Sequence, residues 1–338
     1  MKNALDITCV VPTHNRAPFL RRWLNFYVDF VPEFDVLVVD SSRPDALSEN
    51  SAILRERVGA IRVRHLILKL GVIAKIRQAL ELVETPWVTL CADDDLALPA
   101  AVRQSAEFLA EHPGYSSAQG RTAKVYPRRY LFGCDRLKGF SIEDEDPLVR
   151  CQRLAQNWFT NFYAVYRTET LREMFRLTEL NVDALAEMFL SQLSAIRGRI
   201  KVLPCLHLIL EMHAGAAGVQ CRGVPWADAE AQFQRFRACL VSELVSAGTN
   251  PQLAGAYVDR QFVRFRNPNL RNPRRSAAQW LRYWGQSSRE RLEDWFHEVN
   301  VRHKRPICAR DIGEARTAWR SALTLMRTYP DGIPAAIE

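Results

Sequence analysis

The first half of the chain alternates two kinds of segment, and this alternation limits the folds that it can adopt. Short apolar runs rich in β-branched residues lie at about 6–13, 34–42, 60–68 and 87–92. Segments with apolar residues at helical spacing follow each run, as at 17–30. Apolar strands that alternate with amphipathic helices indicate a parallel sheet covered on both faces. We therefore predict an α/β fold with a Rossmann-like, mostly parallel sheet.

Capping residues indicate where some of these helices begin and end. Ser48 can serve as an N-cap and Gly59 as the C-cap of the same helix, and Pro99 suits the first turn of a helix that ends near Glu111. Four further segments with regular structure are expected in the middle of the chain: a strand at 114–126, a strand running into a helix at 157–175, a helix at 181–198 and a closing strand at 199–204. The pattern then becomes helical, which predicts a domain at 1–220 and a C-terminal basic helical domain at 221–338.

The net charge of +8 is concentrated toward the C-terminal end. Between Arg260 and Arg291, nine arginines stand against one acidic residue, interleaved with Phe, Trp and Tyr. This stretch predicts an anionic partner, either a membrane surface contacted peripherally or a phosphorylated acceptor, with a homodimer contact as a further option. No nucleic-acid-binding motif accompanies the charge, so nucleic acid is not an expected partner.

The cysteines and the apolar runs bear on where the protein works. Eight cysteines are widely spaced and form no CxxC pair, which favours reduced thiols and a cytoplasmic location. No apolar run approaches the roughly 18 residues that span a bilayer. The first residues lack a small-residue cleavage site and predict a first strand. We expect a cytoplasmic protein, with any membrane contact at the inner face.

Polar residues follow three of the predicted strands where each strand ends. The segments are PTHNR after the first strand, DSS after the second and DDD, Asp93 to Asp95, after the fourth. In open parallel sheets, ligands bind at the carboxyl ends of the strands. Three adjacent carboxylates repel one another, so a fold that holds them at a strand end needs something to relieve the repulsion.

These motifs, in this order and spacing, resemble the signature of GT-A fold glycosyltransferases of the family 2 type. The resemblance rests on VVPTHNR, on a second strand that ends in Asp40 and on ADDD, and it covers about residues 7–215. It implies transfer of a sugar from a nucleotide-diphosphate sugar to a hydroxyl acceptor, which would be a glycan, a lipid-linked acceptor or a protein. UDP is the family's most frequent carrier, so a UDP-sugar is the expected donor.

The departing diphosphate needs a counter-charge, and hard divalent cations such as Mn²⁺ or Mg²⁺ take carboxylate oxygens. Asp93 and Asp95 are two residues apart, so along an extended chain they point to the same side. We therefore assign both to the metal or sugar–diphosphate centre, with Asp94 oriented toward the sugar or toward a group that supports the metal ligands. The alternative is that one aspartate caps the Pro99 helix and the others are solvated.

The resemblance places Pro12, His14 and Arg16 around the base and ribose, with Asp40 accepting hydrogen bonds from one of them. His14 could instead be a partly buried turn residue. Thr13 is predicted to bind the donor together with this group, although Thr13 and Asn15 could equally cap the next helix.

A basic residue that faces the diphosphate is also implied, and Lys75 lies at its position, although an exposed helical lysine is the commoner case. A histidine after the closing strand would be a further metal ligand, and His213 fits this place, with His207 nearer the strand body. An aromatic cluster, Trp158, Phe159, Phe162 and Tyr163, could be an acceptor platform or part of the core.

An inverting transferase needs a base to deprotonate the acceptor hydroxyl. The family carries an ED pair about a dozen residues before a glycine and the closing strand. Counting back from Gly198, Glu187 is the second residue of that pair, and Ala186 replaces the first. Asp183, one helical turn earlier on the same face, is the reserve candidate.

Two other functions fit the same sheet. A nucleotidyltransferase also uses a carboxylate-bound metal, but that class opens with a glycine-rich phosphate loop, and PTHNRAPF contains no glycine. A non-catalytic GT-A-like domain that binds a glycan or a partner is the other alternative. A metal-dependent, inverting glycosyltransferase is the function we expect.

Overall fold

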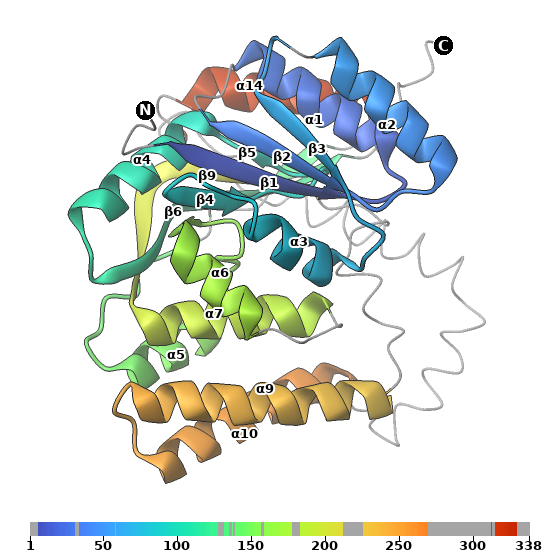
Figure 1. The fold of residues 1–338 in the computed structure, drawn as a ribbon. Helices are drawn as coiled ribbons and strands as arrows, with labels where there is room; N and C mark the ends of the chain where they lie inside the picture. Colours follow the sequence, from blue (N-terminus) through green and yellow to red (C-terminus); the bar gives the residue numbers. More distant parts are fainter. Residues whose placement is uncertain are drawn as a thin grey trace.

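The computed structural model describes residues 6–30, 34–57, 59–127, 132–134, 137, 139–156, 159–177, 183–211, 226–269, 312 and 315–329 (Figure 1). Within them the strands are β1 (Ile7–Thr13), β2 (Asp35–Asp40), β3 (Val63–Ile67), β4 (Trp87–Leu90), β5 (Leu96–Ala97), β6 (Tyr115–Pro127), β7 (Phe132–Cys134), β8 (Val165–Arg167) and β9 (Arg199–Glu211). The helices are α1 (Ala17–Asp29), α2 (Pro44–Glu56), α3 (Val72–Leu80), α4 (Pro99–Glu111), α5 (Pro147–Gln156), α6 (Thr168–Arg176), α7 (Asp183–Arg197), α9 (Trp226–Ser246), α10 (Pro251–Asn269) and α14 (Arg316–Thr328).

The described strands form one mixed sheet in the order β3-β2-β1-β4-β8-β6-β9-β5, with β7 paired to β6. The four N-terminal strands are parallel: β1 lies between β2 and β4, and β3 pairs with β2. β8 is antiparallel to both β4 and β6, whereas β6 and β9 are parallel. The predicted α/β architecture with a largely parallel sheet is confirmed.

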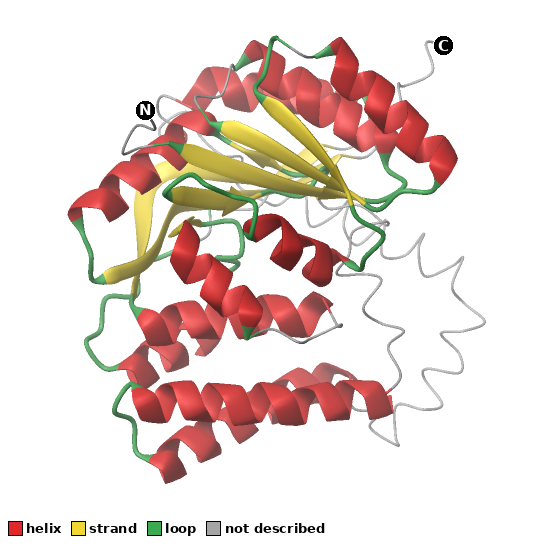
Figure 2. Cartoon of the chain, in the orientation of Figure 1, coloured by secondary structure: helices red, strands yellow, loops and turns green. Residues whose placement is uncertain are grey.

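Helices cover both faces of the sheet, as Figure 2 shows in red against yellow strands. Alternate residues of one strand face opposite layers: Val11 of β1 packs in the cluster with α1, and Val10 in the cluster with α3 and α7. Both valines are fully buried. This burial on both faces explains why the N-terminal strands are continuous apolar runs rather than alternating ones.

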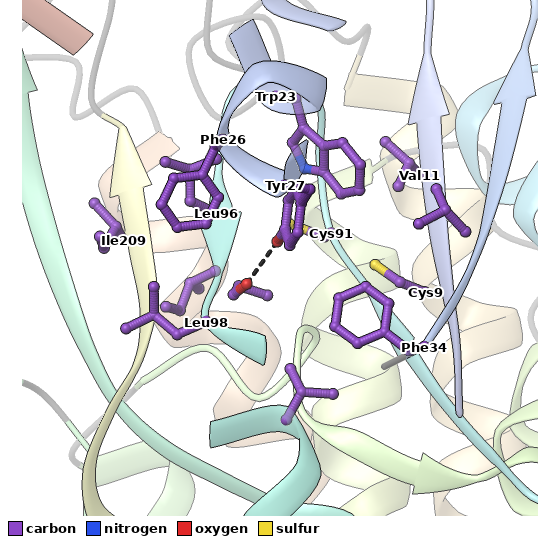
Figure 3. Close-up of a cluster of buried hydrophobic side chains, with 14 of the residues drawn as sticks. Cys9, Val11, Trp23, Phe26, Tyr27, Phe34, Cys91, Leu96, Leu98 and Ile209 are labelled. Atoms are coloured by element: carbon purple, nitrogen blue, oxygen red, sulfur yellow. Dashed lines mark hydrogen bonds between the residues drawn. The ribbon is translucent and has the colours of Figure 1, made fainter. Parts of the chain in front are cut away.

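Aromatic side chains of α1 fill the layer above β1 and β4 (Figure 3). The rings of Trp23 and Tyr27 have centroids 4.0 Å apart, and Phe26 meets Tyr27 edge-on at 5.1 Å. The Tyr27 hydroxyl donates a hydrogen bond to the Ala97 carbonyl at 2.5 Å. This contact fixes α1 against the short strand β5, which directly follows the acidic loop formed by Asp93 to Asp95.

The C-terminal helices pack in two different places. α9 and α10 pack together, and α9 also contacts α7 on one side of the sheet. α14, red in Figure 1, lies beside α1 on the opposite side. Its buried residues Trp319, Ala322 and Met326 join the same cluster as the α1 aromatics. The division into domains 1–220 and 221–338 stays a prediction.

Several predicted boundaries match the structure, whereas the bounds of α2 and of the closing strand differ from the prediction. The helix from Pro99 to Glu111 is confirmed residue for residue. α2 begins at Pro44 and not after Ser48, because proline is pre-organised for the first helical position. It ends at Glu56 with Arg57 as its C-cap, so Gly59, the predicted C-cap, lies beyond the helix. The closing strand continues past Pro204 to Glu211, because register shifts in the β6–β9 pairing accommodate the proline.

α5 was not predicted from the sequence; it begins at Pro147, directly after the acidic residues 143–146. No described helix is both long and apolar enough to cross a membrane.

Candidate functional site

The carboxyl ends of the parallel strands bring the predicted polar segments together. Thr13, the last residue of β1, is paired in register with Asp40, the last residue of β2. β4 pairs with the other side of β1, and the chain continues from Cys91, whose amide donates to the Val10 carbonyl, directly into the acidic loop. The three motifs thus meet at one edge of the sheet, as the sequence predicted.

Asp93 is held by both neighbouring segments. Its Oδ2 accepts a hydrogen bond from the Thr13 hydroxyl at 2.7 Å, and its Oδ1 lies 3.0 Å from the Arg16 guanidinium. Only 1% of the residue is exposed. Burial raises the pKa of Asp93 to about 6, although the Arg16 charge opposes this shift. The carboxylate is therefore close to its protonation equilibrium near neutral pH.

Asp94 shares the same cation. Its Oδ2 lies 2.5 Å from Nη2 of Arg16, whose side chain is 26% exposed and packs over the Phe19 ring at 4.5 Å. A single guanidinium thus bridges two adjacent carboxylates. In the described structure, Arg16 is the group that relieves the repulsion expected between Asp93 and Asp94.

Asp95 faces elsewhere. The loop is a turn closed by a hydrogen bond from the Asp95 amide to the Ala92 carbonyl at 3.2 Å, and not the extended segment expected. Asp93 and Asp95 therefore engage different groups, because the turn rotates Asp95 toward β9. There its Oδ1 accepts from the Glu211 amide at 2.9 Å. Burial, followed by the charge of Asp94, raises the pKa of Asp95.

Lys75 is buried and not an exposed helical lysine. Its Nζ donates to the Thr13 carbonyl at 2.5 Å and to the Ser41 hydroxyl at 3.0 Å. Only 2% of its surface is exposed. Its charge lowers the pKa of Asp93, so this ammonium lies within electrostatic reach of the acidic loop. Burying a lysine is costly unless hydrogen bonds hold it, and the ends of β1 and β2 supply them.

Asp40 is enclosed by its own surroundings. Its Oδ1 accepts from the Ser42 amide at 2.8 Å, and its Oδ2 accepts from Asn50 at 2.7 Å and lies 3.2 Å from His65. The residue is 0% exposed. Burial alone would raise the pKa of Asp40, but the hydrogen bonds from His65, Ser42 and Asn50 lower it to about 2. Asp40 therefore orders the turn that follows β2, and its predicted contact with base or ribose stays a prediction.

The segment after β1 docks onto the segment after β2. His14 is exposed, and its Nδ1 lies 2.9 Å from the Ser41 carbonyl. Asn15 has a left-handed φ of 53° and accepts from the Arg43 amide at 2.8 Å, so it does not cap α1. α1 has no side-chain cap, and neither does α4, so no aspartate of the acidic loop caps the Pro99 helix.

Pro12 is half-buried within β1, in register with Val39. Together with the exposed His14, it stays a predicted contact of the nucleotide.

The predicted base lies on α7, which packs against β6. Burial raises the pKa of Glu187, while a hydrogen bond from Thr160 and the charge of Lys124 lower it. Burial, followed by the charges of Asp95, Asp94 and Glu187, raises the pKa of Tyr163, so these carboxylates all lie within electrostatic reach of its hydroxyl. Asp183 is the first residue of α7, and its side chain lies outside the described part of the structure.

The other predicted residues divide into core and undescribed positions. Phe159 is buried in the core, and Phe162 and Tyr163 pack partly buried against the same cluster. His207 is buried, and its Nε2 lies 3.0 Å from the Tyr163 carbonyl, a structural role within β9. His213 and Trp158 lie outside the described residues.

The side chains at this site can be compared with the ligands that a divalent cation requires. Among the described residues, no group of three His, Cys, Asp or Glu side chains converges as a metal site. The carboxylate oxygens of Asp93 and Asp94 are hard ligands of the right kind, and they already converge on one cation, Arg16. A divalent ion held here would share these oxygens with the guanidinium.

Two residues of this region were not singled out from the sequence. Arg22 of α1 is 2% exposed and donates to the Asp94 carbonyl at 3.2 Å. It also pairs with Glu211, the last residue of β9. A signal was present: Arg22 lies three residues after Phe19 and four before Phe26, on the apolar stripe of its helix. A charge on such a stripe indicates a buried partner.

The comparisons with known proteins agree with this architecture. Residues 8–175 match the family described as glycosyl transferase family 2. A structure of S. aureus TarS 1-349 in complex with UDP-GlcNAc is 17% identical, with a TM-score of 0.55, covering 98% of this chain and 93% of that chain.

Two further TarS 1-349 structures, one of them in complex with UDP, are each 16% identical, with TM-scores of 0.53 and 0.52, covering 97% of this chain and 90% of theirs. At this identity the similarity establishes the GT-A-like fold. No curated protein sequence matches the chain. Through residues 8–175, this chain belongs to glycosyl transferase family 2, and it is a glycosyltransferase.

Proposed function

We propose that this enzyme transfers a sugar from a nucleotide-diphosphate sugar, with a UDP-sugar as the expected donor, to a hydroxyl acceptor. The observation that carries the proposal is the convergence of Thr13, Arg16, Lys75 and the acidic loop at the carboxyl edge of the parallel sheet. S. aureus TarS, which has this fold, has been captured with UDP and with UDP-GlcNAc.

Arg16 and Lys75 are the cations best placed to interact with the donor diphosphate. Arg16 is partly exposed, so its guanidinium can turn toward an incoming anion. Lys75 is fixed by two hydrogen bonds, so it supplies a constant positive field at the same edge. A divalent cation bound by Asp93 together with Asp94 or Asp95 would neutralise charge on the departing diphosphate.

Glu187 is the proposed general base. It accepts the proton of the acceptor hydroxyl while that oxygen forms a bond to the anomeric carbon, and the bond from this carbon to the diphosphate oxygen breaks. This single displacement inverts the configuration. The support is a raised pKa, which makes the carboxylate a stronger base, and the shared action of Glu187, Asp94 and Asp95 on the Tyr163 hydroxyl. Asp183 and the metal ligand His213 stay predictions.

The acceptor and the assembly are inferred from the sequence alone. A glycan, a lipid-linked acceptor or a protein would each present a hydroxyl. The arginine-rich stretch at 260–291 lies largely outside the described residues. Peripheral membrane contact and a homodimer therefore stay predictions.

An Asp93→Asn variant tests the donor site. Because burial raises the pKa of Asp93 to about 6, the neutral asparagine should be accommodated without unfolding. We expect this variant to show no UDP binding in calorimetry with Mn²⁺. We also expect it to release no nucleoside diphosphate from any nucleotide sugar of a panel. Asp259→Asn, an exposed acid of α10 paired with Arg237, is the matched control. Full donor turnover in Asp93→Asn would contradict the assignment, and a wild-type protein that binds no nucleotide sugar would favour a non-catalytic binding domain.

A further inference from the structure

A buried network joins the acidic loop to the C-terminal helix through one arginine. Arg22 reaches three segments: its Nη2 donates to the Asp94 carbonyl at 3.2 Å and pairs with Glu211, and its Nη1 donates to the Tyr329 carbonyl at 3.1 Å. The side chains of Arg22 and Glu211 are 1% and 0% exposed. Arg22 and Glu211 thus form a buried junction between three segments, and not a surface ion pair.

The junction also holds the other side of the acidic loop. The backbone amide of Glu211 donates to Oδ1 of Asp95 at 2.9 Å. Glu211 therefore contacts Asp95 through its backbone and Arg22 through its side chain, while Arg22 contacts Asp94 directly. Two consecutive residues of the acidic loop are fixed by this pair.

α14 supplies the third side. Tyr329 is the C-cap of α14, and its carbonyl is one of the helix-terminal acceptors that have no partner within the helix. A cation at this position is favoured by the helix dipole. α14 is itself anchored by Trp319, Ala322 and Met326, which are buried in the cluster that includes α1. The arginine thus links the packing of α14 to the position of the acidic loop.

We propose that Arg22 is a positioning residue for the donor site and that α14 is a structural part of that site. The inference rests on the proposed function, because it assumes that the acidic loop binds the donor. The Arg22 side chain is buried, with 1% exposed. It acts by fixing the Asp94 carbonyl and, through Glu211, the Asp95 carboxylate. Loss of the link is expected to loosen the loop and α14 together.

The first test measures the loop without any ligand. Hydrogen–deuterium exchange of the full chain should rise in residues 92–98 and 316–329 of Arg22→Met, and Arg22→Lys should restore part of the protection. Arg21→Met is the matched control, since Arg21 neighbours it on α1 but is exposed and pairs with Glu56. Unchanged exchange at 92–98 in folded Arg22→Met would overturn the inference.

If Arg22→Met does not fold, the double variant Arg22→Met/Glu211→Leu removes both buried charges, a replacement that buried ion pairs often tolerate. It keeps the Glu211 backbone contact but lacks the link to Asp94 and Tyr329. We again expect faster exchange in both segments, and normal exchange at 92–98 would overturn the inference.

The second test measures donor binding and separates this inference from the proposed function. UDP with Mn²⁺ should bind Arg22→Met at least tenfold more weakly, with a raised KM for the nucleotide sugar exceeding the change in kcat. Ala322→Asp, which introduces a charge at a fully buried α14 position, should act in the same direction, with the exposed Arg320→Asp as control.

If Ala322→Asp loosens α14 but leaves the loop and UDP affinity unchanged, α14 has no part in the site. A wild-type chain that binds no UDP contradicts the proposed donor, while the exchange experiment still decides the role of Arg22.

Discussion

The guanidinium of Arg16 lies 3.0 Å from the carboxylate of Asp93 and also bridges to the next aspartate of the loop. Arg16 thus already pairs with the carboxylate oxygens that a divalent ion at this loop would need. An internal cation and an external one would compete for the same oxygens, and this competition can be measured.

Replacing Arg16 with methionine should make stability depend on metal. The loss of charge-assisted bonds to buried carboxylates is expected to cost about 1–3 kcal/mol without divalent ions. Mn²⁺ should then raise the melting temperature of Arg16→Met more than that of wild type, because the guanidinium no longer competes. Thermal scans in Mn²⁺ and in EDTA check this, with the exposed Arg21→Met as control. Equal Mn²⁺ responses would argue against a metal at Asp93.

Glu187→Gln should lower turnover without lowering the stability of the protein. Removing a general base typically lowers kcat by about 10²- to 10⁴-fold. Because the folded-state pKa of Glu187 is raised, ionisation of this group disfavours the folded state above its pKa, so the neutral glutamine should not lower the melting temperature. Turnover and donor affinity measured side by side check this. Near-normal kcat would shift the role to Asp183.

The charge of Lys124 should set the acidic limb of the pH profile. Burial raises the pKa of Glu187 and Lys124 opposes that rise. A base must be deprotonated to act, so activity should increase as pH rises through the Glu187 pKa. In Lys124→Met this limb should move to higher pH, whereas Lys201→Met, a half-buried β9 lysine paired with Glu143, should leave it in place. If the acidic limb of Lys124→Met lies at the same pH as that of the wild type, the charge of Lys124 does not act on the catalytic base.

Asp40 should contribute acid-sensitive stability. Its pKa is lowered from 3.8 to about 2, which corresponds to about 2 kcal/mol at neutral pH. A lowered folded-state pKa stabilises above the unfolded-state value, and this contribution declines as pH falls from about 4 to about 2. Urea unfolding of wild type and Asp40→Asn should therefore differ at pH 7 and converge toward pH 2. If the difference in free energy of unfolding between the two proteins is the same at pH 7 and pH 2, the hydrogen bonds of Asp40 do not depend on its negative charge.

Two glycine-to-alanine changes should have opposite effects. A Cβ on Gly120 of β6 would lie 2.5 Å from the Cys205 carbonyl oxygen, so backbone must move and about 1–3 kcal/mol should be lost. A Cβ on Gly255 of α10 meets only the end of the Arg237 side chain at 3.4 Å. Gly255→Ala should be neutral or stabilising by up to about 1 kcal/mol. Chemical denaturation checks both, and equal effects would contradict the close β6–β9 approach.

The sequence predicted the sheet well because burial on both faces leaves a strong pattern. The apolar runs before Thr13 and Asp40 and the helix at Pro99 could each be located from local spacing. The meeting of polar segments at one edge follows from parallel strands. Both features depend only on residues that are neighbours along the chain and on one general rule of sheet topology.

The side-chain directions in the loop could not be predicted in the same way. The sequence predicts an extended chain at Asp93 to Asp95, but the chain forms a turn, in which the Asp95 amide donates to the Ala92 carbonyl and the Asp95 carboxylate accepts from the Glu211 amide. Those partners depend on where β9 lies, which local spacing does not specify. The burial of Lys75 has the same origin, because its acceptors come from the ends of two other strands.

The hydrogen bond from Arg22 to Tyr329 spans 307 positions of the chain. During synthesis, which proceeds from the N-terminus, the first helix leaves the ribosome long before α14 exists. Its apolar flank must then stay uncovered, or be sheltered by a chaperone, until nearly 330 residues have been translated. If translation stops early, the released chain has a folded Rossmann-like half whose apolar α1 surface is not covered by α14. Such chains should be prone to aggregation and degradation.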